Sequence, residues 1–228
     1  MKKEDAANEE IGQIKETGSI LTGGDGPNPI FCLTIIGQIE GHFLLPPDNK
    51  TTKYEHIIPQ LVAIEQSEEI KGLLIILNTV GGDVEAGLAI AELVAGMKKP
   101  TVSLVLGGGH SIGVPLAIAG MHSFIVPSAS MIIHPVRLNG TVIGTEQTYN
   151  YFSLVQTKII DFVVEHSGIT RDKFGELLQN TSQLANDVGS ILYGREAVEA
   201  GLIDSLGGLS DALACLHEKI RQNRAGAY

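Results

Sequence analysis

The chain has 228 residues, of which 43% are hydrophobic and 5% aromatic, and it carries a formal net charge of −10. This length suits one α/β domain with a sizeable core, and the acidic charge argues against nucleic acid as a partner, because phosphate groups favour basic surfaces. The longest apolar run, at 101–120, is broken by glycines, His110 and Pro115, and the N-terminus lacks the apolar run of a signal peptide. We therefore expect a cytoplasmic protein without a membrane span.

The predicted elements alternate between strands and helices along the chain. Residues 1–18 are polar and charged, so we expect a disordered N-terminal segment, followed by a single domain at 19–228. Strands are predicted from apolar, β-rich runs at 30–37, 72–78, 101–109 and, as two short pieces, within 122–135. Helices are predicted at 56–69, 86–97, 111–121, 145–168, the start of 195–208, and 209–222.

Several boundaries follow from single residues. The double proline and polar tip of residues 42–55 predict a loop, and Pro59 is expected in the first turn of the helix that follows. Ser210 is the expected N-cap of the last helix. Alternating strands and helices imply right-handed crossovers and a mostly parallel sheet. The helix at 145–168 is long enough to project from the core and serve assembly.

Two glycine-rich turns follow consecutive predicted strands, NTVGGD at 78–83 and GGGHSIG at 107–113. Open α/β sheets bind their ligands at the carboxyl ends of strands, where free N–H groups gather at helix starts. Ser111 in the second turn is either a nucleophile, since GHSIG fits the pattern G-x-S-x-G, or an N-cap serine. The N–H of Gly81 or Gly82 and that of Ile112 could form an oxyanion hole, or the first turn is simply a tight connection.

A serine nucleophile needs a base within hydrogen-bond reach. His110 is adjacent to Ser111, but neighbouring side chains diverge at a strand-to-helix turn. His134, at the end of an apolar strand, is the better candidate for the base, although a partly buried structural histidine fits the same position.

Metal, cofactor and disulfide chemistry have no support in the sequence. The seven histidines form no HExxH motif, and neither glycine turn matches a phosphate-binding loop. Cys32 and Cys215 form no CxxC motif, so we expect two small core residues in a reducing compartment. No metal and no cofactor are therefore expected.

Four motifs, in order and in register, resemble the ClpP family of serine peptidases. They are NTVGGDVEAGLAI, LGGGHSIGVPLAIAG, PSASMIIHP and REAVEAGLID, and the resemblance extends from about Ile35 to Leu206. The stretch at 44–65 is most similar to the translocation-enhancing branch of that family, which is found in spore-forming bacteria. The resemblance implies a ClpP/crotonase-like fold of repeated β-β-α turns, with 145–168 as the projecting handle helix.

The resemblance also implies an activity and an assembly. Ser111 matches the nucleophile, His134 the general base and acid, and Gly82 and Ile112 the oxyanion donors. The implied function is an endopeptidase, not itself dependent on ATP, which hydrolyses peptides or unfolded segments inside a homo-oligomer of stacked rings. A link to protein export or spore-related processing is part of this expectation, and docking of an unfoldase is left open.

The sequence departs from the family pattern around each catalytic position. Gly109-His110 replaces Ala-Ala, Ile112 replaces Met, and His134-Pro135 is one residue shorter than His-Gln-Pro. We interpret His110 as part of the pocket wall. Counting back from Glu196 places the triad acid at Gly189, which cannot serve, so the register must shift. Our first choice for the acid is Asp187, and the alternatives are Asp172, Asn180 and Asn186.

Other functions stay open on the sequence alone. The unclear acid favours a catalytically weak or inactive assembly protein. A crotonase-type acyl-CoA enzyme would need an active-site glutamate pair and a basic phosphate site, neither of which is visible. A serine–lysine dyad would require one of Lys98, Lys99 or Lys158, and none has an obvious position beside Ser111.

Overall fold

The structure is a computed structural model that describes residues 19–22, 28–138, 140, 142–183 and 188–225. Its described part contains nine strands in one connected sheet. The strands are β1 (Ile20–Thr22), β2 (Ile30–Glu40), β3 (Thr51–Lys53), β4 (Gly72–Gly82), β5 (Thr101–Gly109), β6 (Ser123–Ile125), β7 (Ser130–Ile133), β8 (Ser190–Tyr193) and β9 (Ser205–Leu206). The helices are α2 (Tyr54–Gln66), α3 (Val84–Ala95), α4 (Gly113–Ile118), α5 (Thr145–Glu165), α6 (Arg171–Leu178), α7 (Gly194–Glu199) and α8 (Leu209–Ala225).

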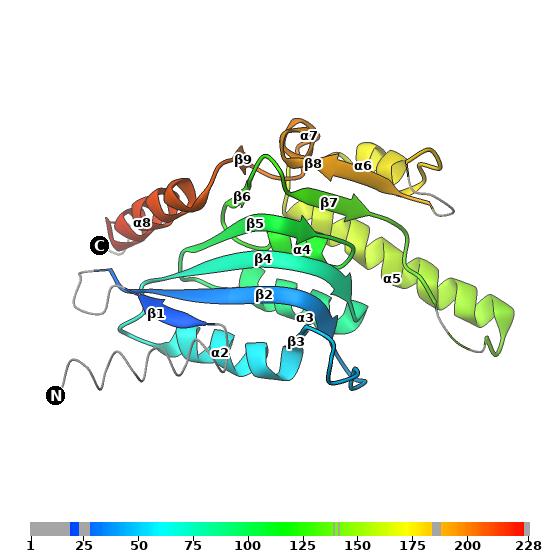
Figure 1. Cartoon of the computed structure of the whole chain (residues 1–228), viewed down its shortest axis with the longest axis horizontal. Helices are drawn as coiled ribbons and strands as arrows, with labels where there is room; N and C mark the ends of the chain where they lie inside the picture. The colour runs from blue at the N-terminus through cyan, green and yellow to red at the C-terminus, as the bar shows by residue number, and fades with distance from the viewer. Residues whose placement is uncertain (1–18, 23–27, 139, 141, 184–187, 226–228) are drawn as a thin grey trace.

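The sheet is mostly parallel, which confirms the predicted α/β class. Its main path runs β1-β2-β4-β5-β6-β9, with β3 beside β2, and β7 bridging β5 to β8. The pairs β1–β2 and β7–β8 are antiparallel, and the other pairs are parallel. In this arrangement the carboxyl ends of β4, β5 and β7 come together at one end of the sheet (Figure 1).

Alternating side chains of the central strands fill two apolar layers. Leu33, Ile75 and Val105 belong to the larger cluster, which the helices α2, α3 and α4 complete. The opposite face carries Leu74 and Leu104, and the residues of α8 that pack on them are Ala212, Leu216 and Ile220. Because both faces are covered, the strands read as nearly continuous apolar runs rather than as an alternating pattern.

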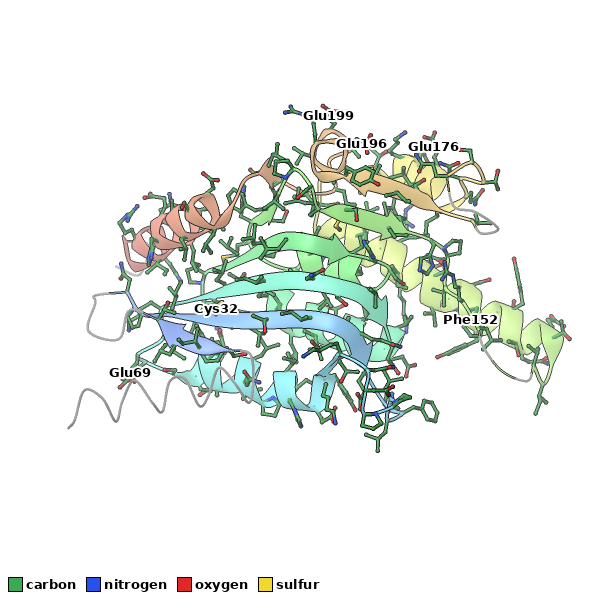
Figure 2. The ribbon with its side chains drawn as sticks, viewed as in Figure 1. Cys32, Glu69, Phe152, Glu176, Glu196 and Glu199 are labelled. Carbon is green, nitrogen blue, oxygen red and sulfur yellow. The ribbon has the colours of Figure 1, made fainter. Side chains whose placement is uncertain are left out.

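Both cysteines belong to this second layer. Cys32 on β2 (Figure 2) and Cys215 on α8 are half-buried, free thiols that pack beside the cluster under α8. Burial raises the pKa of both thiols. They pack as the small apolar residues that the sequence predicts.

The long handle helix is present as α5. It covers Thr145–Glu165 rather than 145–168, and it ends where the N–H of His166 donates to the carbonyl of Phe162. Only Phe162 and Val163, near its end, are fully buried among its described side chains. The first half of α5 projects away from the sheet (Figure 1).

In the described part of the chain, no helix combines the length and apolar character needed to cross a bilayer.

Three predictions about boundaries are wrong. The loop predicted at 42–55 contains β3, which pairs with β2, so α2 begins early and Pro59 lies in its second turn. Pro59 and Glu55 are exposed, so water can hydrate the carbonyl that the proline leaves without a donor. Ser210 lies inside α8, and Gly208 caps the helix by donating its N–H to Asp211 Oδ2 at 2.8 Å.

A further difference affects the site itself. The stretch 78–83 is not a turn, because β4 continues through Gly82 and pairs with Gln38 and Ile39 of β2. The strand β8 and the helix α6 have no counterpart among the predicted elements. Helix α6 contributes to the pocket described below, and β8 pairs with β7.

Candidate active site

The predicted site residues line one pocket at the carboxyl ends of β4, β5 and β7. Its volume is about 400 Å³, and Gly82, Ser111, Ile112 and His134 all form part of its wall. The remaining lining combines the polar side chains of Gln38 and Arg137 with apolar residues, which include Val80, Val114, Ile133, Ile159, Phe174 and Leu178. The structure thus brings together four of the five residues that the sequence singles out.

Ser111 sits in a strained turn between β5 and α4. Its φ is +57°, and it is the one non-glycine residue with positive φ among those the structure describes. The N–H of Ser111 donates to the carbonyl of Ile132 at 2.8 Å. The N-cap of α4 is Ile112, without a side-chain bond, so the Ser111 hydroxyl does not cap this helix. A left-handed conformation at a residue other than glycine costs conformational free energy. Such residues cluster at functional sites.

The two glycines at the end of β4 are packed so closely that no side chain fits, Gly81 against Ser111 and Gly82 against Ile39 of β2. A Cβ atom on Gly81, where φ is +87°, would lie 2.7 Å from Ser111 Cβ and 2.8 Å from the carbonyl oxygen of His110. A Cβ atom on Gly82, where φ is +153°, would lie 2.2 Å from the carbonyl oxygen of Ile39. Glycine is therefore required at both positions.

Of the two glycines, Gly82 has the available N–H. The Gly81 N–H donates to Thr79 Oγ1 at 3.0 Å, and that hydroxyl donates in turn to the carbonyl of Gly37 at 2.6 Å. The Asp83 N–H donates to the carbonyl of Ile39, so the Gly82 N–H, one residue earlier, faces away from β2. Gly82 can therefore direct its N–H toward the pocket.

The second expected donor is the N–H of Ile112. Its neighbours on both sides are bonded, since Ser111 donates to Ile132 and Gly113 donates to His110. Within the described residues the Ile112 N–H itself has no acceptor. A buried N–H without a partner is rare, and it is the group that an oxyanion would satisfy.

His134 follows β7 directly and has a defined tautomer. Its Nδ1 lies 2.7 Å from the carbonyl oxygen of Pro135, which can only accept, so Nδ1 carries the proton and Nε2 is free to act as a base. The following N–H, of Val136, donates to Gln156 Oε1 on α5 at 2.8 Å. No hydrogen bond joins His134 to Ser111 among the described residues.

His110 is not part of the pocket wall, so that interpretation is wrong. Its Nε2 lies 3.0 Å from Ser130 Oγ, and its ring packs over Gly108 rather than lining the pocket. Burial lowers the pKa of His110, and the positive charge that His134 can carry lowers it further. His110 is consequently protonated less readily than a free imidazole.

The acid of the triad is the least defined part of the site. Asp187 and Asn186 lie outside the described residues. Asp172 is exposed on the first turn of α6, and Asn180 uses its side chain to bond Ser190 and Ser182. In the described part of the chain neither Asp172 nor Asn180 bonds to His134, whose Nδ1 is taken by Pro135.

The described structure does not support a serine–lysine dyad with Lys99 or a metal site. The Lys99 ammonium donates to the carbonyls of Ser67 and Ile70, away from the pocket lining, and its desolvation lowers its pKa. No cluster of three His, Cys, Asp or Glu side chains suited to a metal ion occurs among the described residues.

The sequence reasoning missed part of the pocket. Phe174 and Leu178 come from α6, which was not predicted, and Ile159 comes from the handle helix. A signal for α6 does exist, because Thr170 accepts the Lys173 N–H at 3.2 Å as an N-cap ahead of the run RDKFGELL.

Comparison with known proteins identifies the family of this chain. The sequence model of the Clp protease family matches residues 32–208. The translocation-enhancing protein TepA of Halalkalibacterium halodurans is 60% identical over 214 residues, covering 94% of this chain and 84% of that protein. The ATP-dependent Clp protease proteolytic subunits of Leuconostoc citreum and Streptococcus uberis are 31% and 29% identical, over 55% and 66% of this chain and 58% and 76% of theirs. The chain belongs to the Clp protease family.

Proposed function

We propose that this protein is a serine peptidase that hydrolyses peptides or unfolded protein segments, with Ser111 as nucleophile and His134 as general base and acid. One observation carries the proposal. A strained serine, a histidine with a free Nε2 and two available N–H groups, those of Gly82 and Ile112, converge on one pocket of about 400 Å³. Membership of the Clp protease family supports the same activity.

The reaction follows from these groups. Ser111 Oγ attacks the peptide carbonyl carbon while His134 Nε2 takes the hydroxyl proton. The oxyanion that forms accepts hydrogen bonds from the Gly82 and Ile112 N–H groups. The tetrahedral intermediate then collapses, the amine leaves with the proton from His134, and an acyl ester remains on Ser111. A water molecule, deprotonated by His134, attacks this ester and releases the acid.

Catalysis requires a hydrogen bond between His134 and Ser111 that is not formed among the described residues. Catalytic hydrogen bonds are often long in the absence of substrate and tighten when it binds. The Pro135 carbonyl already fixes the histidine tautomer, which is one role that an acid plays in a triad. Asp187 remains our proposal for a carboxylate that stabilises the imidazolium formed during the reaction.

The exposed handle suggests how the chain assembles. Tyr149 and Leu154 on the projecting part of α5 are 72% and 63% exposed, so this helix carries large hydrophobic side chains that a partner could cover. We propose that the α5 helices of different copies pair through these exposed side chains in a homo-oligomer of stacked rings. We propose the cytoplasm as the location of this assembly. The name of the Halalkalibacterium relative supports a link to protein export.

A fluorophosphonate probe tests the nucleophile. We expect the wild-type protein to be labelled and to hydrolyse an unfolded substrate such as casein, and Ser111→Ala to lose labelling and at least about 10³-fold in activity. His134→Ala should lose activity to a similar extent while keeping its fold. Labelling that survives Ser111→Ala would refute the assignment. Absence of labelling and hydrolysis in wild type would favour a non-catalytic assembly protein.

The variant Asp187→Asn tests the acid separately. Because the Pro135 carbonyl holds Nδ1, we expect a loss in kcat/KM of about tenfold, rather than the roughly 10⁴-fold loss that follows when an acid is the sole partner of Nδ1. A loss near 10⁴-fold would show that Asp187 replaces Pro135 as that partner in the working enzyme. Asp172→Asn, exposed on α6, is the matched control.

A further inference from the structure

Main-chain pairing between the strand that precedes Ser111 and the strand that precedes His134 is limited. Ser111 follows β5 and His134 follows β7, and these strands share one register pair in the described structure, Gly108 with Ser130. Beyond that pair, the Ser111 N–H donates to the carbonyl of Ile132. The other neighbour of β7 is β8, which carries neither residue. Any additional bond between the end of β5 and β7 therefore acts directly on the separation of the two side chains.

The His110 side chain supplies such a bond. Its Nε2 lies 3.0 Å from Ser130 Oγ, so the residue before the nucleophile is joined to the first residue of β7. The site has room for this imidazole because residue 108 is glycine. A Cβ atom there would lie 2.9 Å from both Cε1 and Nε2 of His110. The ring is half-buried, and a hydrogen bond in such a position is better shielded from competing water than one at the surface.

We propose that His110 is a positioning residue of the site, and that its bond to Ser130 sets the distance between Ser111 and His134. This inference rests on the proposed peptidase function. His110 does not contact the reacting atoms, and it acts through β7. The side chain of residue 110 thus helps to place the two catalytic side chains, at a position where the family pattern has alanine.

A double-mutant cycle tests the bond. The variants His110→Ala, Ser130→Ala and the double variant are compared for kcat and KM on a fluorogenic peptide. Each single change should lower kcat about tenfold with KM within about twofold, and the double variant should be no worse than either single one. His110→Gln, whose amide can still bond Ser130, should keep kcat within about threefold of wild type. Additive losses, or an unchanged kcat in His110→Ala, would overturn the proposal.

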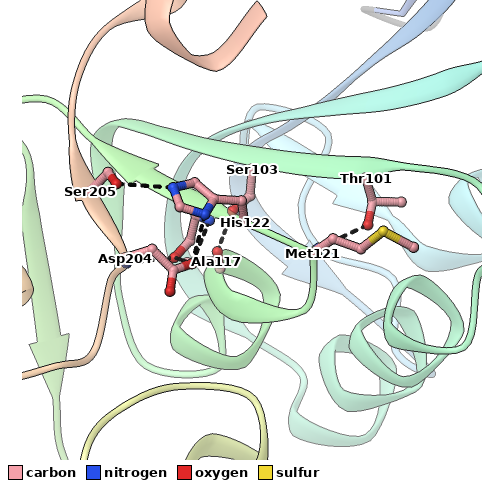
Figure 3. A network of polar contacts seen from close by, with 8 residues as sticks. Thr101, Ser103, Ala117, Met121, His122, Asp204 and Ser205 are labelled. Atoms are coloured by element: carbon pink, nitrogen blue, oxygen red, sulfur yellow. Dashed lines mark hydrogen bonds and ion pairs between the residues drawn. The ribbon is translucent and has the colours of Figure 1, made fainter. Parts of the chain in front are cut away.

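A second serine–histidine pair provides a matched control. His122 Nε2 lies 2.9 Å from Ser205 Oγ, in a network with Asp204 that joins β6 to β9 away from the pocket lining (Figure 3). His122→Ala and Ser205→Ala remove the same kind of bond and should leave kcat unchanged. If these variants lower kcat as much as His110→Ala does, a general loss of stability explains the effect, and His110 has no special role.

Hydrogen exchange measured by mass spectrometry separates this inference from the peptidase proposal. His110→Ala and Ser130→Ala should each speed amide exchange in 130–137 severalfold, and the His122→Ala control should not. This result would support the bond between His110 and β7 even if the wild-type protein hydrolysed no peptide, an outcome that would refute the proposed function alone. Unchanged exchange in 130–137 would refute the positioning role whatever the activity.

Discussion

The two walls of the pocket are built in different ways. On the nucleophile wall, Gly81, Gly82, Ser111 and Ile112 lie on or next to β4 and β5, long and mostly buried strands of the central sheet that are joined by ladders of main-chain hydrogen bonds. On the base wall, His134 follows a strand of four residues, and the segment after it is held by Gln156. One wall therefore depends on the central strands of the fold. The other depends on a short strand, held by β8 and by the Ser111 N–H, and on side-chain hydrogen bonds such as that of Gln156.

This difference sets the size of the effects that we expect. A half-buried hydrogen bond contributes on the order of 1 kcal/mol, so losing one on the base wall should move His134 without unfolding the protein. On the nucleophile wall, an added atom has no free volume to enter, because buried cores are close-packed. Substitutions there should abolish the site, whereas substitutions on the base wall should weaken it by degrees.

Gly81→Ala is the sharpest way to break the nucleophile wall. Its methyl group would lie 2.7 Å from Ser111 Cβ, at a φ of +87° that non-glycine residues rarely adopt. Displacing a catalytic group by about 1 Å can cost about 100-fold in rate, so we expect kcat/KM to fall at least about 100-fold. Stability should also fall by about 1–3 kcal/mol. Peptide hydrolysis, probe labelling and thermal unfolding together measure these losses.

The matched control is Gly175→Ala on α6. A methyl group there meets no atom within 4 Å, and alanine favours a helix over glycine by roughly 0.5–1 kcal/mol. Activity should be unchanged and stability slightly increased. If Gly81→Ala retained full activity, the close approach of β4 to Ser111 would not be a feature of the working site.

Gln156→Ala tests the base wall. The change removes the acceptor of the Val136 N–H, two residues after His134, and leaves the core intact. We expect kcat to fall about tenfold with little change in KM, and stability to fall by about 1 kcal/mol. Gln147→Ala is the control, because Gln147 is exposed on the same helix and forms no side-chain hydrogen bond within the described residues. Equal effects of the two changes would place the cause in the helix rather than in the contact.

The same contrast explains what the sequence could predict. The strand at 101–109 and the two glycine-rich segments were found because long apolar runs and glycine clusters are local signals. The pocket position of Ser111, Gly82, Ile112 and His134 followed from four motifs in register. Each half of the nucleophile wall is encoded in a short contiguous motif, so its residues are predictable from the sequence.

The base wall was less predictable because it is assembled from distant residues. Gln156 lies 20 positions from the N–H that it accepts, and Ser130 lies 20 positions from His110. On the nucleophile wall, one feature is likewise not local: the continuation of β4 through Gly82 depends on pairing with β2. The His134 tautomer likewise depends on where the Pro135 carbonyl points in the folded chain.

The smallest expected effect concerns the pH dependence of stability, and it arises where the two walls meet. Burial, followed by the charge of nearby His134, lowers the pKa of His110 below its ordinary value of 6.5. As pH falls, the unfolded chain therefore binds a proton at His110 before the folded protein does, and the folded state loses stability as pH falls below about 6.5.

The variant His110→Gln cannot titrate at this position, so its melting temperature should fall less than that of wild type between pH 7.5 and pH 5.5. Between pH 7.5 and pH 8.5 His110 is neutral in both states, and the difference between the two proteins should stay constant. If both proteins lost the same stability on acidification, His110 would be as easily protonated in the folded state as in the unfolded chain, and its environment beside His134 would not be the desolvated one described here.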